Sequence, residues 1–300
     1  MTSPASLQTL LTGAIDYAGL FPPAALSMRG AVARYAAYRA SSDAWALGRF
    51  VVPLSRAEEL ATDQRALSVP SQGWRLSVLL GEDPSADATK IRAFNATYAR
   101  LARIDSAEAK LTGDAASVRR AIAKLAEHIP SSVRLYIEIP TTEDLGSLVA
   151  AIRTVNACAK IRTGGVTADA FPESRAVARF LVCCAEHDTR FKATAGLHHP
   201  WRGSYPLTYE SNAPRATMFG FLNVMVAAVV ARAGGTLDDI VEILDSERGS
   251  DFRFGDDELR WRDFRLTPQQ LVEAHASFAQ SFGSCSFDEP MHDLRRLALL

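Results

Sequence analysis

The chain has 300 residues, enough for one large barrel or for two modest domains with a sizeable core. Hydrophobic residues make up 48% and charged residues 22%, which is typical of a globular protein. The formal net charge of −1 favours neither nucleic acid nor an anionic membrane as a partner. We therefore expect a globular protein with no nucleic-acid or membrane partner.

The cysteines and the apolar stretches indicate where the protein works. None of the 4 cysteines stands in a CxxC motif or at metal-ligand spacing: Cys158, Cys183, Cys184 and Cys285. Residues 1–11 lack the basic start and long apolar core of a signal peptide. The longest apolar run, residues 219–231, is too short to span a bilayer. These features favour reduced thiols in a cytoplasmic protein.

Strand and helix signals alternate along the chain. The expected strands are residues 14–18, 47–52, 75–80, 101–111, 133–139, 157–162 and 190–198. The expected helices cover residues 28–39, a segment from Ser55, 85–99, 115–128, a segment from Thr141 or Thr142 to 156, and 171–187. Ser55 and Glu58 have the spacing of a capping box, and Asp114 is placed to cap the helix that follows it. The strands recur roughly every 25–35 residues, the length of a βα unit.

Regular βα alternation predicts a parallel sheet, and seven or eight units favour a closed (β/α)8 TIM barrel over an open sheet. We expect the eighth strand at residues 280–286 and a closing helix at 288–299. Residues 200–278 would then form a mostly helical insertion between strands seven and eight, within a single domain of residues 1–300. Its length leaves two roles open, a lid over the site or a surface for homo-oligomer formation.

Alternation along each strand predicts which side chains face the inside of the barrel. In a parallel strand covered by helices, the apolar set faces the helices and the other set faces inward. Strand one therefore places Asp16 inside, and strand five places Arg134, Tyr136 and Glu138 inside. The charged inward residues near the C-terminal strand ends, where barrel active sites form, are Glu108, Lys110, Glu138, Lys160, Arg162, Lys192 and His198.

Strand four allows two registers. If Asp105 faces inward, Glu108 and Lys110 face the helices, which is costly for two charges. If Glu108 and Lys110 face inward, only Asp105 is misplaced, near the start of the strand. We favour the second register unless a bulge changes it.

Two neighbouring strands carry lysines within recognisable motifs. Residues 160–164 read Lys-Ile-Arg-Thr-Gly, and residues 191–196 read Phe-Lys-Ala-Thr-Ala-Gly. They resemble the Lys-Thr-Ser-Thr-Gly and Val-Lys-Ala-x-Gly-Gly strands of the class I deoxyribose-phosphate aldolase family. Three other strand ends are similar to that family in the same order: Ile-Asp-Tyr-Ala at 15–18, Leu-Tyr-Ile-Glu at 135–138 and Gly-Ser-Cys-Ser at 283–286.

The resemblance implies a barrel enzyme in which Lys160 forms a Schiff base with a carbonyl substrate and Lys192 is the second lysine. The family's acidic residue on strand four matches Asp105 or Glu108. Arg162 stands where the family has a small hydroxyl residue. Gly-Leu-His-His at 196–199 replaces the family's second glycine and following basic residue. We therefore expect a different substrate.

The chemistry of these residues supports the same hypothesis. A lysine attacks a carbonyl only when unprotonated, and a nearby cation such as Lys192 lowers the pKa of the nucleophile Lys160. The residues expected to move protons are Glu138, Glu108 and Asp16. The residues expected to bind an anionic group are Arg162, Lys110, His198, and the loop of Gly283, Ser284 and Ser286.

We therefore expect a Schiff-base lyase or aldolase that acts on a small carbonyl compound bearing a phosphate or carboxylate. No organic cofactor is expected. No metal is expected either, because His198 and His199 are adjacent and point apart on a strand. Two alternatives stay open. The same basic pocket could serve acid–base chemistry by Glu138 or His198, or the lysines could be ion-pair partners in a barrel that only binds ligands.

Overall fold

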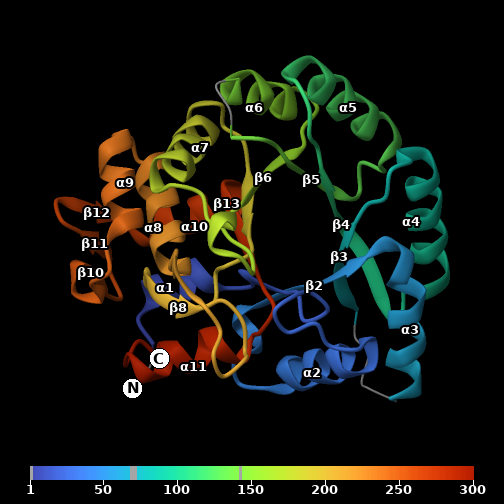
Figure 1. Cartoon of the computed structure of the whole chain (residues 1–300), viewed down its shortest axis with the longest axis horizontal. Coiled ribbons are helices and arrows are strands. Elements are labelled where there is room, and N and C mark those ends of the chain that lie inside the picture. Colours follow the sequence, from blue (N-terminus) through green and yellow to red (C-terminus); the bar gives the residue numbers. More distant parts are fainter. Residues whose placement is uncertain (1–2, 68–72, 142–143) are drawn as a thin grey trace.

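Eight parallel strands close into a barrel in the computed structural model, which describes residues 3–67, 73–141 and 144–300 (Figure 1). Their order around the barrel is β1, β13, β7, β6, β5, β4, β3, β2. The strands are β1 (Ile15–Tyr17), β2 (Leu47–Pro53), β3 (Trp74–Leu79), β4 (Ala102–Lys110), β5 (Arg134–Glu138), β6 (Cys158–Arg162), β7 (Phe191–Thr194) and β13 (Ala279–Ser284). The expected α/β TIM barrel is confirmed.

Helices surround the barrel and alternate with its strands along the chain (Figure 1). They are α2 (Met28–Ala40), α3 (Ala57–Ala66), α4 (Pro84–Tyr98), α5 (Ala115–His128), α6 (Leu145–Thr154), α7 (Ser174–Glu186) and α11 (Asp288–Arg296), with α1 (Ala5–Leu11) preceding β1. Helix α5 buries Val118, Ile122 and Leu125, which recur at helical spacing and face the sheet. Every helix in the described part of the chain is too short or too polar to cross a membrane.

The helix starts agree with the sequence at some positions and differ at others. The Asp114 side chain caps α5, accepting a hydrogen bond from the Ser117 N–H. The capping box expected at Ser55 is wrong, because a 3₁₀ turn (Leu54–Arg56) intervenes and α3 begins without a side-chain cap. Helix α6 begins at Leu145, later than expected from Thr141; Thr142 lies outside the described residues.

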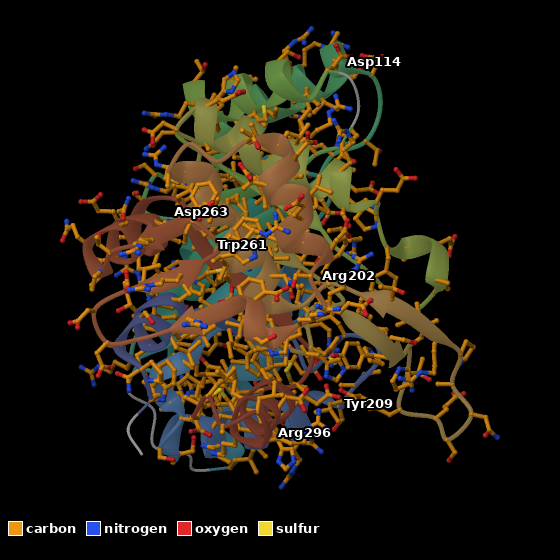
Figure 2. All side chains as sticks on the ribbon, turned by 90° about the vertical axis from the view of Figure 1, so that its left-hand side faces the viewer. Asp114, Arg202, Tyr209, Trp261, Asp263 and Arg296 are labelled. Atoms are coloured by element: carbon orange, nitrogen blue, oxygen red, sulfur yellow. The ribbon has the colours of Figure 1, made fainter. Side chains whose placement is uncertain are left out.

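The segment between β7 and β13 is less helical than expected. It contains α8 (Phe221–Arg232), α9 (Leu237–Asp245) and α10 (Pro268–Ser277), together with two small antiparallel sheets. These sheets are β8 (Gly203–Pro206) with β9 (Arg215–Met218), and β10 (Phe252–Phe254) with β11 (Leu259–Trp261) and β12 (Phe264–Leu266). Figure 2 looks onto this segment, with Trp261 on its three-stranded sheet.

Helix α8 supplies the regular crossover to the last barrel strand. It begins at Phe221, shortly after strand β9 (Arg215–Met218). Every residue from 221 to 231 is buried. The helix packs against α7, α9, α10 and β13, so its uniformly apolar surface is explained by burial on all sides.

A bulge in β4 decides the register of that strand. The pairing with β3 runs Leu76 to Ile104 and then Ser77 to Ser106, so Asp105 is skipped. The Asp105 carboxylate points inward to the guanidinium of Arg49, and Glu108 also points inward. Each expected register placed only one of these two acidic side chains inside the barrel. The extra residue of the bulge lets both of them face the interior.

Candidate active site

A cavity of about 250 Å³ opens at the C-terminal ends of the barrel strands. Among the residues that line it are Glu108, Lys160, Arg162, Lys192 and His198, all of which the sequence placed in the site. Gly283 from the end of β13 also lines the cavity. Strand alternation therefore predicts the charged wall correctly, because the barrel interior receives every second side chain from each strand.

The two lysines lie side by side and share one carboxylate. Lys160 of β6 and Lys192 of β7 are directly paired in the sheet register. The Glu108 carboxylate bridges them, with its Oε2 atom 2.9 Å from the Lys160 amine and its Oε1 atom 2.7 Å from the Lys192 amine. The exposed fraction of the side chain is 6% for Lys160, 1% for Lys192 and 3% for Glu108. These charges therefore interact with little screening by water.

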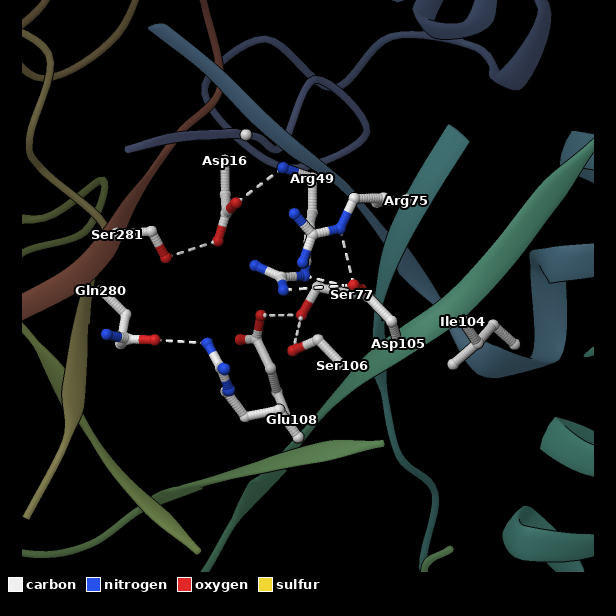
Figure 3. A network of polar contacts seen from close by, with 12 residues as sticks. Asp16, Arg49, Arg75, Ser77, Ile104, Asp105, Ser106, Glu108, Gln280 and Ser281 are labelled. Atoms are coloured by element: carbon white, nitrogen blue, oxygen red, sulfur yellow. Dashed lines mark hydrogen bonds and ion pairs between the residues drawn. The ribbon is translucent and has the colours of Figure 1, made fainter. Parts of the chain in front are cut away.

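Lys192 is held as a cation. Its amine donates hydrogen bonds to Asp16 Oδ2 at 2.6 Å and to Glu108 Oε1 at 2.7 Å. Burial opposes the charge, but the carboxylates of Asp16 and Glu108 outweigh it and raise the pKa of Lys192 above its usual range. Asp16 is held in turn by the Ser281 hydroxyl and the Arg49 backbone N–H, which both donate to it (Figure 3).

Glu108 is held as an anion. Burial favours its neutral form, but Lys192 and Lys160 outweigh burial and hold the pKa of the carboxyl well below its usual range. The Ser77 hydroxyl also donates to Glu108 Oε1 at 2.7 Å, and Figure 3 shows this contact within the network. Glu108 is thus a fixed negative charge between two amines.

Lys160 is held differently from its neighbour. Its amine lies 2.9 Å from Glu108 and 3.0 Å from Glu138 Oε2, yet that buried Glu138 oxygen accepts no hydrogen bond from the described residues. The contacts of Lys160 are therefore electrostatic, whereas those of Lys192 are directed hydrogen bonds. Glu138 also lies 3.5 Å from Arg162, whose side chain is 49% exposed at the cavity mouth.

A second polar cluster forms the rim of the cavity. His198 Nδ1 lies 3.3 Å from Glu289 Oε2 and 3.8 Å from the Cys285 sulfur. Burial disfavours the charged ring, but hydrogen bonds with Cys285 and Glu289 outweigh it and raise the pKa of His198 to about 9. The Tyr209 hydroxyl, from the loop between β8 and β9, donates to Glu289 at 2.8 Å. Tyr209 lies on the insertion side of the molecule in Figure 2.

Three expected binding residues lie outside the cavity wall. Lys110 is exposed at the end of β4, where it pairs with Glu138 in the sheet register, and it does not line the cavity. Ser284, the last residue of β13, and Ser286, in the loop after it, are both buried. The Ser286 N–H donates to the Ser284 hydroxyl, and the Ser286 hydroxyl accepts from the Glu289 N–H. The Ser284 hydroxyl also lies 3.5 Å from His198 Nδ1, so it contacts a cavity residue without lining the cavity itself.

Several residues of the site were missed by the sequence analysis. Ser77 and Ser281 orient the two carboxylates that hold Lys192. Alternation on β3 and β13 places both inward, so the same periodicity could have found them. Cys285 and the apolar lip of Phe21, Pro22 and Pro23 also line the cavity. The lip belongs to the loop after β1, for which no strand periodicity applies.

Within residues 3–67, 73–141 and 144–300, no three or more His, Cys, Asp or Glu side chains are grouped so that they could hold a metal ion. In sequence comparisons, no family model and no curated protein matches the chain. Among solved structures, the chain is similar to the Bacillus cereus spore cortex-lytic enzyme SleL, with a TM-score of 0.39 and 10% identity. The match covers 96% of this chain and 74% of that chain. A match this weak identifies neither a reaction nor a substrate.

Proposed function

We propose that this protein is a Schiff-base-forming lyase or aldolase that acts on a small anionic carbonyl compound. The observation that carries the proposal is that two adjacent lysines at one cavity have different kinds of contact with their carboxylate partners. Both line the cavity, but Lys192 is fixed by hydrogen bonds as a cation, whereas Lys160 is held by charge without a directed hydrogen bond to Glu138. The five strand-end motifs that resemble the class I deoxyribose-phosphate aldolase family support the same assignment.

Lys160 would begin the reaction by transferring its proton to Glu138, whose Oε2 atom has a free lone pair and lies 3.0 Å away. The neutral amine then attacks the carbonyl carbon of the substrate, Glu138 returns the proton to the former carbonyl oxygen, and water leaves to form an iminium ion. This cation occupies the position of the former ammonium, between Glu108 and Glu138. The two carboxylates therefore stabilise the charge that develops in the reaction.

Carbon–carbon cleavage follows from the iminium ion. A carboxylate removes the proton of the β-hydroxyl group, the bond between the α and β carbons breaks, and its electron pair flows into the iminium. An aldehyde leaves and an enamine remains on Lys160. Return of a proton to the α carbon and addition of water release the second product and restore the amine. The charge of Lys192 keeps Glu108 ionised throughout.

The cavity limits the substrate to a small molecule, because its volume is about 250 Å³. The positive charge of His198 is opposed by Glu289. Arg162 lines the cavity mouth with a side chain that is 49% exposed, and its planar guanidinium suits a carboxylate or a phosphate. We therefore expect the anionic end of the substrate to contact Arg162.

Borohydride trapping tests the proposal directly. The protein is incubated with small aldehydes and keto acids, reduced, and analysed by mass spectrometry after digestion. We expect an adduct on Lys160 that is lost in Lys160→Ala and kept in Lys110→Ala, since Lys110 is an exposed lysine outside the cavity. Absence of an adduct with every candidate, together with an unchanged activity of Lys160→Ala, would refute Schiff-base chemistry.

A second function, binding an anionic small molecule without covalent chemistry, is favoured by one observation. Both amines already have carboxylate partners, as expected for structural ion pairs. Lys160→Arg distinguishes the two functions, because it keeps the charge and removes the nucleophile. Activity or ligand binding that survives this substitution would favour the second function.

A further inference from the structure

The N-terminal end of the barrel, opposite the candidate active site, contains a larger cavity of about 650 Å³. Four arginines line it: Arg49 of β2, Arg75 of β3, Arg134 of β5 and Arg190 immediately before β7. Strand starts in a barrel are ordinarily closed by packing or paired charges, since catalysis takes place at the other end. Here four cations, from β2, β3, β5 and the start of β7, line one open space.

These arginines are not neutralised by the groups around them. Asp105 accepts hydrogen bonds from Arg49 Nε at 2.7 Å and from Arg75 Nε at 2.6 Å, so one carboxylate serves two guanidinium groups (Figure 3). Arg134 donates to the neutral side chain of Gln280. Arg190 is half-buried and forms no ion pair with residues 3–67, 73–141 or 144–300.

Negative groups near the cavity reduce this excess without removing it. The exposed carboxylate of Glu127 lies on the rim, and the C-terminal end of α5 brings the negative end of a helix dipole to the same place. Two carboxylates still face four guanidinium groups. A half-buried cation without a partner is costly, and a bound anion would offset that cost.

The rest of the wall indicates what kind of anion fits. Apolar side chains of Ile129, Val133, Leu135 and Val155 line the cavity beside the arginines. A guanidinium presents parallel N–H groups that match the oxygens of a phosphate. The cavity is large enough for a phosphate group with an organic substituent lying on the apolar wall.

We propose that the N-terminal mouth of the barrel is a binding site for a phosphate group, free or as the phosphate ester of a small organic molecule. Arg134 and Arg190 supply guanidinium groups that pair with no carboxylate among the residues that the structure describes. Arg49 and Arg75 supply the N–H groups that Asp105 leaves free. The site is separate from the lysine cavity, so it does not depend on the reaction proposed for Lys160.

Calorimetric titration of the full chain with inorganic phosphate and with phenyl phosphate, at constant ionic strength, tests this site. We expect binding that weakens about tenfold or more in Arg190→Gln and in Arg134→Gln. Arg29→Gln, which removes an exposed arginine of α2, is the matched control and keeps the wild-type affinity. Tighter binding of phenyl phosphate assigns the site to an ester, and equal binding assigns it to the free ion.

Arg162→Gln separates this site from the active-site cavity. Phosphate binding at the N-terminal mouth survives this substitution, whereas binding next to the lysines does not. The proposal is overturned if neither ligand binds, or if binding is lost in Arg162→Gln and unchanged in both Arg190→Gln and Arg134→Gln. Circular dichroism of each variant confirms that a loss of binding is not a loss of fold.

Discussion

Replacing Lys192 with methionine removes the cation that two buried carboxylates share. The amine lies 2.6 Å from Asp16 and 2.7 Å from Glu108, and the three side chains are 1%, 1% and 3% exposed. Methionine has a similar length and no charge, so packing is largely kept while both carboxylates lose a partner. Breaking a buried ion pair in this way costs about 3–5 kcal/mol, and we expect that loss in the free energy of unfolding at pH 7.

The loss should depend on pH in a defined direction. Lys192 holds the pKa of Glu108 below its usual range, so this carboxylate stabilises the fold above its unfolded pKa of about 4.3. That contribution is lost as the pH falls through the folded pKa. In Lys192→Met the Glu108 carboxyl can take up a proton at a higher pH than in the wild type, so the difference in stability between the two proteins narrows as the solution becomes acidic.

At alkaline pH, the contribution of Lys192 to stability changes with pH in the opposite direction. The pKa of Lys192 is raised, so its contribution is complete below its unfolded pKa of about 10.4 and is lost as the pH rises through the folded value. Wild type therefore approaches Lys192→Met in stability at strongly alkaline pH. The difference between the two proteins should be largest between these acidic and alkaline ranges.

Urea unfolding followed by tryptophan fluorescence measures this profile. Lys90→Met, at an exposed position of α4, is the control and should change the free energy of unfolding by no more than about 0.5 kcal/mol. A loss below about 1 kcal/mol at pH 7 for Lys192→Met would contradict the buried network. A loss of the same size at pH 4 and pH 7 would contradict the charge linkage.

Three further predictions concern the surroundings of the lysines. The NMR titration of His198 should have a midpoint near 9, and Glu289→Gln should lower that midpoint. Because the pKa is raised in the folded protein, protonated His198 stabilises the fold fully below its unfolded pKa of about 6.5. This stabilisation is lost as the pH rises through 9. An unchanged midpoint in the variant would show that the carboxylate is not responsible. Gly164→Ala should slow borohydride trapping about tenfold, because a Cβ at this position would lie 2.4 Å from a ring carbon of Phe171 and 3.0 Å from the Cα atom of Gly196, which lines the cavity. Trapping at the wild-type rate would contradict this. Ser77→Ala should cost about 1.5–3 kcal/mol in urea unfolding, since it removes a hydrogen bond to the charged Glu108, and a neutral effect would argue against that bond.

Much of the fold follows from patterns within single elements. Period-two alternation on strands such as β5 and β6 predicts which side chains face inward, and this placed Glu138 and Lys160 correctly. The βα spacing predicts the barrel, and the barrel determines that strand ends meet at one mouth. The polar face of a strand is encoded locally, so the sequence alone determined that two lysines and several carboxylates share the interior.

Other features depend on contacts between distant residues, which no local pattern encodes. The bulge at Asp105 arises from the pairing of β4 with β3, and it brings both Asp105 and Glu108 inside. Asp16 meets Lys192 across 176 residues because the barrel closes through β13. Which of the two lysines at the cavity is tied by directed hydrogen bonds was decided only by the tertiary structure, as was the open space at both ends of the barrel. The physical reason is that periodicity determines the direction of a side chain, whereas its partners are set by register and closure.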